Sequence, residues 1–145
     1  MRLEDRIWIN APPEAIFSFF EAMETNYLRW HPDHRLFRFE QGRGLREGVV
    51  VYFEEVIGDK VLKKRVHYTR IVPNRHIEFT FVKGLFRLFL PRMVFRMEPQ
   101  DGGTLFVAQI DIRIGPIGAW LNRRDFQRVR QHMREEGENL KQLIE

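Results

Sequence analysis

The 145-residue chain contains no cysteine. This excludes a disulfide framework, thiolate metal ligands and a cysteine nucleophile, so any metal would be held by histidines and carboxylates. No apolar run approaches the roughly 18 residues that a membrane span needs, and residues 1–10 do not resemble a secretion leader. From its length and its 43% hydrophobic content we expect one domain over residues 1–145, in a soluble cytoplasmic protein.

Basic residues outnumber acidic ones by 24 to 20, and the sequence pI is about 9.8. A basic surface attracts nucleic acid or anionic lipid through its charge. The basic residues at 63–65 lie in a strand-like run, however, and the arginines between positions 123 and 134 spread around a predicted helix. This spacing predicts a solvated basic surface and no specific nucleic-acid site.

Hydrophobic periodicity and turn residues predict an α+β order of elements. A strand at 3–10 precedes two short helices, the first beginning near Pro12 and Pro13 and the second covering 21–28. A long helix covers 122–144. Six strand-like runs lie between, at 36–40, 49–57, 61–72, 75–82, 87–98 and 104–114. The short connections between these runs favour an antiparallel sheet.

The segment INAPPEAIFSFFEAMETNYLRWHPDH, residues 9–34, has a strand ending in Ala-Pro-Pro-Glu before an apolar helix and a tryptophan. Together with the order of elements, it resembles the START-like (SRPBCC) superfamily, which includes polyketide cyclases, lipid-transfer domains and the birch pollen allergen. The resemblance implies a helix-grip fold: a curved antiparallel sheet of six or seven strands wraps around the long C-terminal helix. It also implies a ligand cavity between sheet and helix.

The stretch QHMREEGENL, residues 131–140, places a histidine and a glutamate four positions apart on the predicted last helix. The apolar stripe of this helix consists of Phe126, Val129, Met133, Leu140 and Ile144. Glu136 lies roughly 45° and His132 roughly 85° from the centre of the stripe, whereas Glu135 lies nearly opposite. We therefore expect Glu136 to face inward, His132 to lie at the margin and Glu135 to face water. This spacing lets two side chains share one cation, although it also fits a simple surface hydrogen bond.

The loop RWHPDH, residues 29–34, offers two further histidines directly after the helical pair. A neutral imidazole nitrogen of His31 or His34 can bind a metal, and Asp33 can orient the neighbouring ring. The alternative is that both histidines are ordinary polar loop residues.

The strand-like run VVVYFEEVIGDK, residues 49–60, contains two adjacent glutamates. If Gly58-Asp59 forms a two-residue hairpin turn, Glu55 pairs with Leu62 and faces the core, while Glu54 faces solvent. An inward carboxylate among apolar neighbours is costly unless it is paired, protonated or bound to a cation. A shift of one residue in the register would exchange the two glutamates.

Two imidazoles and two carboxylates suit zinc or another divalent first-row metal. The pattern resembles that of the diacetylphloroglucinol hydrolases, helix-grip enzymes that cleave a carbon–carbon bond between an acyl group and a phenolic ring. Those enzymes hold zinc with a His, Glu, His, Glu set whose last pair lies on the terminal helix. The resemblance implies that the metal ligands here are His34 or His31, Glu55 or Glu54, His132 and Glu136. The metal would be catalytic if one coordination position stays open and structural if all are closed.

The cavity should be lined by the inward faces of the strands and of the last helix, with aromatic walls that suit a flat or lipid-like molecule. The ligand-contacting residues that we predict are His31, Phe53, Tyr68, Phe79, Phe81, Phe95 and Met133. In the strand predicted at 87–98, the apolar residues just before Pro91 exceed what one buried face requires. They would form an entrance gate, a homodimer contact or a membrane-touching loop.

Three functions agree with these patterns. The first is a metal-dependent hydrolase of an acyl-phenolic or polyketide-like molecule. The second is a non-catalytic carrier or sensor of an apolar ligand, in which the helical His and Glu are only polar lining. The third is an interaction module that acts through its basic face.

Overall fold

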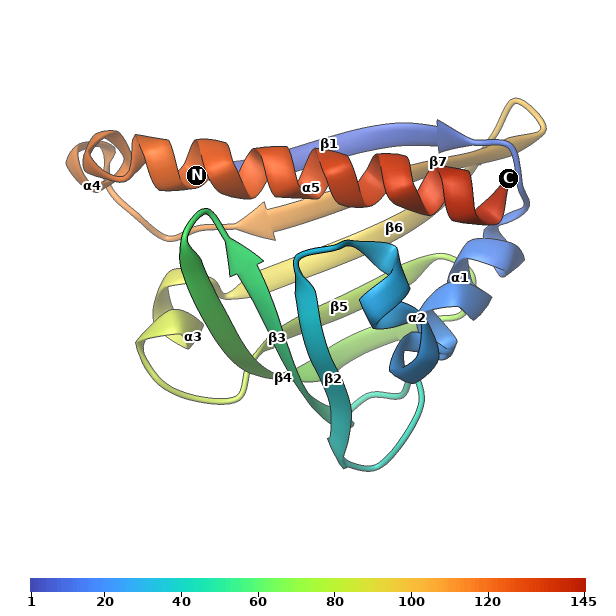
Figure 1. Ribbon diagram of the computed structural model, residues 1–145, viewed down its shortest axis with the longest axis horizontal. Coiled ribbons are helices and arrows are strands. Elements are labelled where there is room, and N and C mark those ends of the chain that lie inside the picture. The colour runs from blue at the N-terminus through green and yellow to red at the C-terminus, as the bar shows by residue number, and fades with distance from the viewer.

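The computed structural model describes residues 1–145 and contains one seven-stranded antiparallel sheet, which confirms the predicted α+β helix-grip fold (Figure 1). The strands lie in the order β1-β7-β6-β5-β4-β3-β2. They are β1 (Arg2–Ile9), β2 (His34–Gln41), β3 (Val50–Ile57), β4 (Lys60–Val72), β5 (His76–Phe81), β6 (Arg92–Gln100) and β7 (Gly103–Asp111). The helices are α1 (Pro13–Glu21), α2 (Met23–Trp30), α3 (Leu85–Phe89), α4 (Pro116–Leu121) and α5 (Arg123–Ile144). None of these helices is long and apolar enough to cross a lipid bilayer.

Helix α5 packs mainly on β1 and also contacts β3, β7 and α2 (Figure 1). Met133 and Leu140 of its apolar stripe are buried, as the periodicity predicted. Gly137 lies at this contact, where a Cβ atom would lie 3.2 Å from Asp5 Oδ2 and 3.4 Å from Ile7 Cγ2. A larger side chain at this position would therefore press against β1.

The β3–β4 hairpin has the register that the Gly58-Asp59 turn predicts. Glu55 lies opposite Leu62, and Gly58 adopts a left-handed φ of 66°, which glycine adopts without steric cost. Glu55 is therefore on the face that looks toward α5, and Glu54 is on the other face. Both glutamates have the orientation expected from the sequence.

Strand β2 contains an irregularity that the periodicity of the sequence did not predict. His34 lies opposite Glu55, but Leu36 lies opposite Glu54, so Arg35 has no partner on β3. An extra residue of this kind reverses the alternation of side chains along a strand. As a result His34 shares the inner face with Phe37, three positions away, while Arg35 is exposed.

The strand predicted at 87–98 is wrong in its first part. Leu85–Phe89 form the short helix α3, and β6 begins only at Arg92. Gly84, with a φ of 92°, ends the extended run after β5, and Pro91 has no N–H to donate to a sheet ladder. The second part is confirmed, because Met93 and Met97 are buried on the inner face of β6.

Candidate metal centre and ligand cavity

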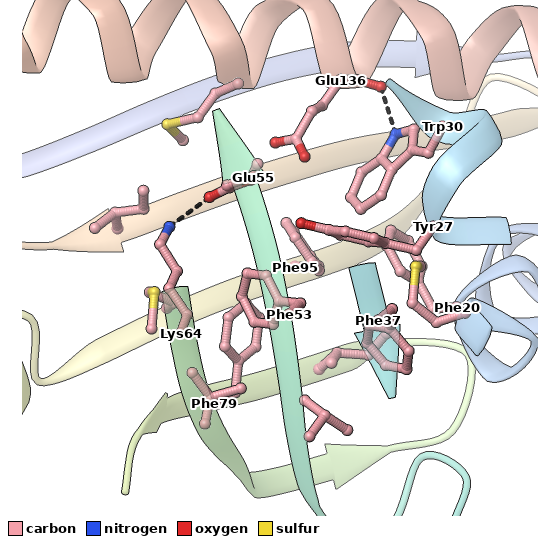
Figure 2. Close-up of a pocket in the computed structure, with 18 of the residues that line it drawn as sticks. Phe20, Tyr27, Trp30, Phe37, Phe53, Glu55, Lys64, Phe79, Phe95 and Glu136 are labelled. Carbon is pink, nitrogen blue, oxygen red and sulfur yellow. Dashed lines mark hydrogen bonds and ion pairs between the residues drawn. The ribbon is translucent and has the colours of Figure 1, made fainter. Parts of the chain in front are cut away.

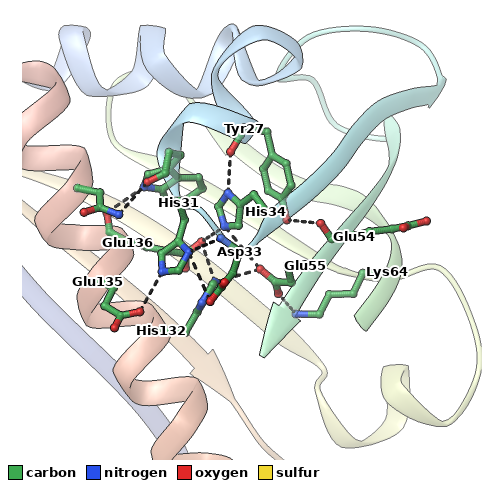
Figure 3. Close-up of polar contacts among 12 residues, drawn as sticks. Tyr27, His31, Asp33, His34, Glu54, Glu55, Lys64, His132, Glu135 and Glu136 are labelled. Carbon is green, nitrogen blue, oxygen red and sulfur yellow. Dashed lines mark hydrogen bonds and ion pairs between the residues drawn. The ribbon is translucent and has the colours of Figure 1, made fainter. Parts of the chain in front are cut away.

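His34 is the first residue of β2, and the end of α2 holds its ring in place (Figure 3). Its Nδ1 lies 2.7 Å from the backbone oxygen of Tyr27, and the Tyr27 ring stacks on it with a centroid distance of 3.9 Å. A carbonyl oxygen only accepts hydrogen bonds, so Nδ1 must donate. In the neutral ring, Nε2 then presents a lone pair to the glutamates beside it, which is the state that binds a metal.

His31 has a different arrangement, because both of its nitrogens are engaged (Figure 3). Its Nδ1 accepts the backbone N–H of Asp33 at 2.9 Å, so Nε2 donates to Glu135 Oε1, also at 2.9 Å. This hydrogen bond lowers the pKa of the Glu135 carboxyl. The expectation that Glu135 points only to water is thus met in part: its side chain is 41% exposed but reaches back to the loop. His34 thus lies beside the inner carboxylates, whereas His31 forms a second group with His132 and Glu135 whose atoms could also hold a cation.

The two adjacent glutamates of β3 have separate partners. Glu55 is buried, and its Oε1 accepts a hydrogen bond of 2.5 Å from Lys64 Nζ. Glu54 lies on the outer face, where its Oε2 accepts a hydrogen bond from the Tyr52 hydroxyl. Only Glu55 therefore belongs to the inner cluster.

The helical pair completes that cluster. His132 Nε2 lies 3.2 Å from Glu55 Oε2 and 3.5 Å from Glu136 Oε2, while His34 Nε2 lies 2.8 Å from Glu136 Oε2. One ligand atom from each of the four residues lies within 4.8 Å of all the others. His132 was expected at the margin of the helix, but it is only 6% exposed. The ring of His31, with its centroid 4.3 Å away, covers it.

Electrostatics require a positive charge at the centre of this cluster. Two carboxylates converge there, Glu55 buried and Glu136 half-buried, and an imidazole lone pair aimed at a carboxylate is repelled unless a proton or cation lies between them. Burial opposes the charged form of His132, but its hydrogen bonds to Glu136 and Glu55 outweigh burial and raise its pKa to about 10. Burial likewise opposes the ionised carboxyls, yet Lys64 and His132 keep the pKa of Glu55 low, and His132 and His34 keep that of Glu136 low. A divalent cation fits the same donor set and would replace the proton on His132.

A cavity of about 120 Å³ adjoins the cluster between the sheet and α5 (Figure 2). Nineteen of its 24 lining residues are hydrophobic, so the walls are apolar and the polar groups are few. Of the ligand-contacting residues predicted, the cavity is lined by Phe53, Tyr68, Phe79, Phe95 and Met133. His31 and Phe81 lie outside it; Phe81 instead packs on Phe86 of α3, with a centroid distance of 5.4 Å.

The lining residues that were not predicted from the sequence include Tyr27, Trp30 and Lys64. Trp30 donates a hydrogen bond of 2.9 Å from Nε1 to the backbone oxygen of Glu136, which ties α2 to α5 (Figure 2). Lys64 lies opposite Phe53 in the hairpin register. The Gly58-Asp59 turn already predicted this register, in which Lys64 shares the inner face with Leu62. The inward orientation of Lys64 could therefore have been predicted from the sequence.

Tyr68 provides a hydroxyl in the apolar part of the cavity. The residue is buried, and its hydroxyl makes no hydrogen bond within the protein, although no fully enclosed polar side-chain atom of the chain lacks a partner. Tyr68 is one of the residues that line the cavity, so this hydroxyl is a candidate contact for a ligand. Burial raises its pKa well above the usual value, so the proton stays on the oxygen and can be offered to a ligand.

Solved structures of other proteins share this architecture. The protein TTHA0849 from Thermus thermophilus is 17% identical over 99% of this chain and 97% of its own, with a TM-score of 0.73. Ms6760 from Mycobacterium smegmatis is 18% identical over 98% and 89%, with a TM-score of 0.72. The di-domain aromatase/cyclase BexL of the BE-7585A biosynthetic pathway is 12% identical over 100% of this chain and 50% of its own, with a TM-score of 0.75. At these identities the likeness concerns the fold.

No curated protein sequence matches the chain. The family model described as polyketide cyclase / dehydrase and lipid transport matches residues 1–145. With the sheet, the last helix and the apolar cavity as described, this match over the full chain shows that the protein belongs to the polyketide cyclase / dehydrase and lipid transport family.

Proposed function

We propose that the protein binds a flat apolar molecule in the cavity next to a divalent metal ion, zinc or a metal of similar chemistry. The metal ligands in this proposal are His34, Glu55, His132 and Glu136. The observation that carries it is the convergence of two imidazole nitrogens and two carboxylates, largely shielded from solvent, at one end of an otherwise apolar cavity. Such a site can hold a cation that also touches the ligand.

The charge of the site suggests which ligand it accepts. When both histidines act as neutral ligands, the carboxylates of Glu55 and Glu136 and the ammonium of Lys64 together carry one net negative charge. A divalent cation that replaces the His132 proton leaves the site with one net positive charge. A ligand with one acidic oxygen, such as a phenolate, an enolate or a carboxylate, would restore neutrality.

The chain supplies groups that can position such a ligand. Lys64 lines the cavity beside Glu55, and its ammonium can contact an anionic oxygen. The Tyr68 hydroxyl can donate a hydrogen bond from the opposite, apolar part. The aromatic walls exclude water, which strengthens both interactions. When bound, a divalent cation would supply a Lewis acid that polarises a carbonyl or phenolic oxygen.

The reaction that we propose is hydrolysis of an acyl-phenolic or polyketide-like molecule, as the resemblance to diacetylphloroglucinol hydrolases implies. The bond between the acyl carbon and the ring carbon breaks. The hydroxyl of water joins the acyl carbon to give a carboxylic acid, and the ring carbon takes the proton. Tyr68, which keeps its proton and lines the cavity, is the candidate donor for that ring carbon.

A second candidate is a carrier without catalysis. It is favoured because the polar groups of the cluster already have hydrogen-bond partners within the protein. Glu55 forms hydrogen bonds with Lys64 and His132, and no fully enclosed polar side-chain atom lacks a partner. An ion pair that closed on itself would clamp α5 to the sheet and leave only an apolar cavity for the ligand.

The metal content of protein purified without a histidine tag tests the proposal. We expect about one zinc-like ion per chain in wild type and in Glu54→Gln, and a loss of most of it in Glu55→Gln. Each variant removes one negative charge, and the two residues are adjacent in the chain. A general effect of charge would therefore lower the metal content of both variants equally. Less than about a tenth of an equivalent of metal in wild type, with no rise in melting temperature on adding zinc, would reject the metal site.

Turnover separates the enzyme from the carrier. An acylphloroglucinol is incubated with the metal-loaded protein, and release of the carboxylic acid is followed. Acid release that stops on chelation and resumes when zinc is added supports the hydrolase. Tight binding of the same compound with no acid released assigns the carrier function instead.

A further inference from the structure

Most of the large apolar side chains that this protein exposes lie in two short helices. Twelve large hydrophobic residues are exposed, and seven of them belong to α3 and α4. We call these seven the α3–α4 surface: Leu85, Phe86, Leu88, Phe89, Ile117, Trp120 and Leu121. None of them is less than 48% exposed, and Ile117 reaches 78%. Concentrated exposure of this kind marks a contact surface, whereas scattered apolar residues need no explanation.

The two helices lie at the same end of the molecule, although more than twenty residues separate them in the chain (Figure 1). The backbone N–H of Arg113, just before α4, donates a hydrogen bond of 2.7 Å to the carbonyl oxygen of Phe89 at the end of α3. The surface therefore belongs to one connected part of the structure. The turn between β3 and β4 lies at the same end (Figure 1), and Val61, the second residue of β4, is 55% exposed.

The two chain segments that carry this surface have charge of one sign, and Asp111 and Asp125 directly flank the second of them. Residues 79–97 and 112–124 contain no aspartate or glutamate. The exposed cations next to the apolar residues are Lys83, Arg87, Arg113, Arg123 and Arg124. The Arg123 guanidinium lies 4.4 Å from the centre of the Trp120 ring, so a cation and an indole are presented together. Apolar and indole side chains bordered by arginine and lysine match the boundary between lipid tails and anionic headgroups.

We propose that the α3–α4 surface docks the protein on membranes that contain anionic lipid. The apolar side chains enter the region below the headgroups, and the surrounding cations pair with lipid phosphates. A second copy of the chain is a poorer occupant, because a twofold contact through this surface would bring together two sets of cations that outnumber the acidic residues at its border. The inference does not depend on the metal site, since it rests on residues outside the cavity.

Sedimentation with lipid vesicles tests the proposal. One set of vesicles contains phosphatidylcholine alone, and the other also contains about 30% phosphatidylglycerol, which supplies the negative surface potential. We expect the wild-type protein to sediment with the anionic vesicles only. The double variant Phe86→Ser/Trp120→Ser should bind them at least about tenfold more weakly, because it removes buried apolar area at the interface. Leu28→Ser/Leu143→Ser, which changes two exposed apolar residues elsewhere, should bind like wild type.

Charge reversal provides a second, matched comparison. Arg123→Glu/Arg124→Glu should abolish binding to the anionic vesicles, whereas Arg46→Glu/Arg70→Glu should retain most of it. All four arginines are exposed, and both variants change the net charge equally. Because the substituted side chains are on the surface, both proteins should fold, which circular dichroism and melting temperature verify.

Three results would overturn the proposal. The first is equal sedimentation with both kinds of vesicle or with neither. The second is unchanged binding by Phe86→Ser/Trp120→Ser, which would reduce the effect to general charge. The third is a dimer in sedimentation velocity that this variant dissolves, which would assign the surface to a second copy.

Discussion

His34 lies directly opposite Glu55 in the β2–β3 pair, with 3.7 Å between Nε2 and Oε2. Strict alternation back from Phe37 would have placed Arg35 on the inner face and His34 outside. The unpaired Arg35 reverses that order and directs the imidazole toward the carboxylates on β3 and α5. One irregular residue in an edge strand thereby completes the four-residue cluster, which agrees with the frequent occurrence of bulges beside functional sites.

Substitution of the loop histidine should weaken metal binding strongly. His34→Gln removes a proposed ligand whose tautomer and orientation are set by its hydrogen bond to the Tyr27 carbonyl. We expect the affinity for zinc to fall at least about 100-fold, measured by competition with a chelating dye. His67→Gln changes a histidine of β4 that is not part of the cluster and should leave the affinity unchanged. Equal affinity in wild type and His34→Gln would remove this residue from the ligand set.

Substitutions of His31 and Glu135, which support the cluster, should lower zinc affinity less than substitution of a proposed ligand. His31→Ala takes away the ring that covers His132, and Glu135→Gln weakens the hydrogen bond that orients His31. Each should lower zinc affinity by about tenfold, within the range seen for groups that hold metal ligands. Glu138→Gln, an exposed charge on the same helix, is the control. A loss in His31→Ala as large as that in His34→Gln would instead make His31 a ligand.

Much of this arrangement follows from local chemistry that can be read in the chain. The Gly58-Asp59 turn sets the hairpin register and therefore the orientation of Glu55. The helical period places Glu136 toward the core, and the fold follows from the order of strands and helices. These features depend on residues close together in sequence, for which periodicity and turn rules suffice.

What could not be predicted depends on contacts between distant segments. The choice between His31 and His34 rests on the unpaired residue in β2 and on the Tyr27 carbonyl, neither of which leaves a periodic signal. His132 lies at the margin of the apolar stripe, which by itself predicts partial exposure. It is buried because the loop that contains His31 folds over it. The helix α3 escapes prediction because its apolar residues are exposed and follow no core-facing pattern.

Lys64 should determine whether the cavity prefers charged ligands. In Lys64→Met the ammonium beside Glu55 is lost while the volume of the side chain is largely kept. Binding of the fluorescent anion anilinonaphthalene sulfonate should fall about tenfold, because a charge-assisted contact is removed. Binding of uncharged phenylnaphthylamine should change little. Lys63→Met alters the neighbouring exposed lysine and should bind both probes like wild type; equal loss of both probes in Lys64→Met would indicate a damaged cavity.

The stability of the metal-free protein should depend on pH through His132. Its native pKa of about 10 lies above the ordinary value of 6.5, so the folded protein holds this proton more tightly than the unfolded chain does. The resulting stabilisation is complete below pH 6.5 and is lost as the pH rises toward about 10. Glu55 and Glu136 have lowered pKa values, so their contribution is already complete above the ordinary value of 4.5 and adds no slope in this range.

Melting temperatures measured in the presence of a chelator, from pH 6.5 to about pH 10, test this expectation. The wild-type protein should lose more stability across the range than His132→Gln, which has no proton to release, and His67→Gln should behave like wild type. Zinc should reduce the slope of the wild-type protein, because a bound cation takes the place of the proton on His132 and the remaining charge no longer depends on pH in this interval. Parallel curves for wild type and His132→Gln would mean that His132 is neutral in the folded protein, and that another cation must then balance the two carboxylates.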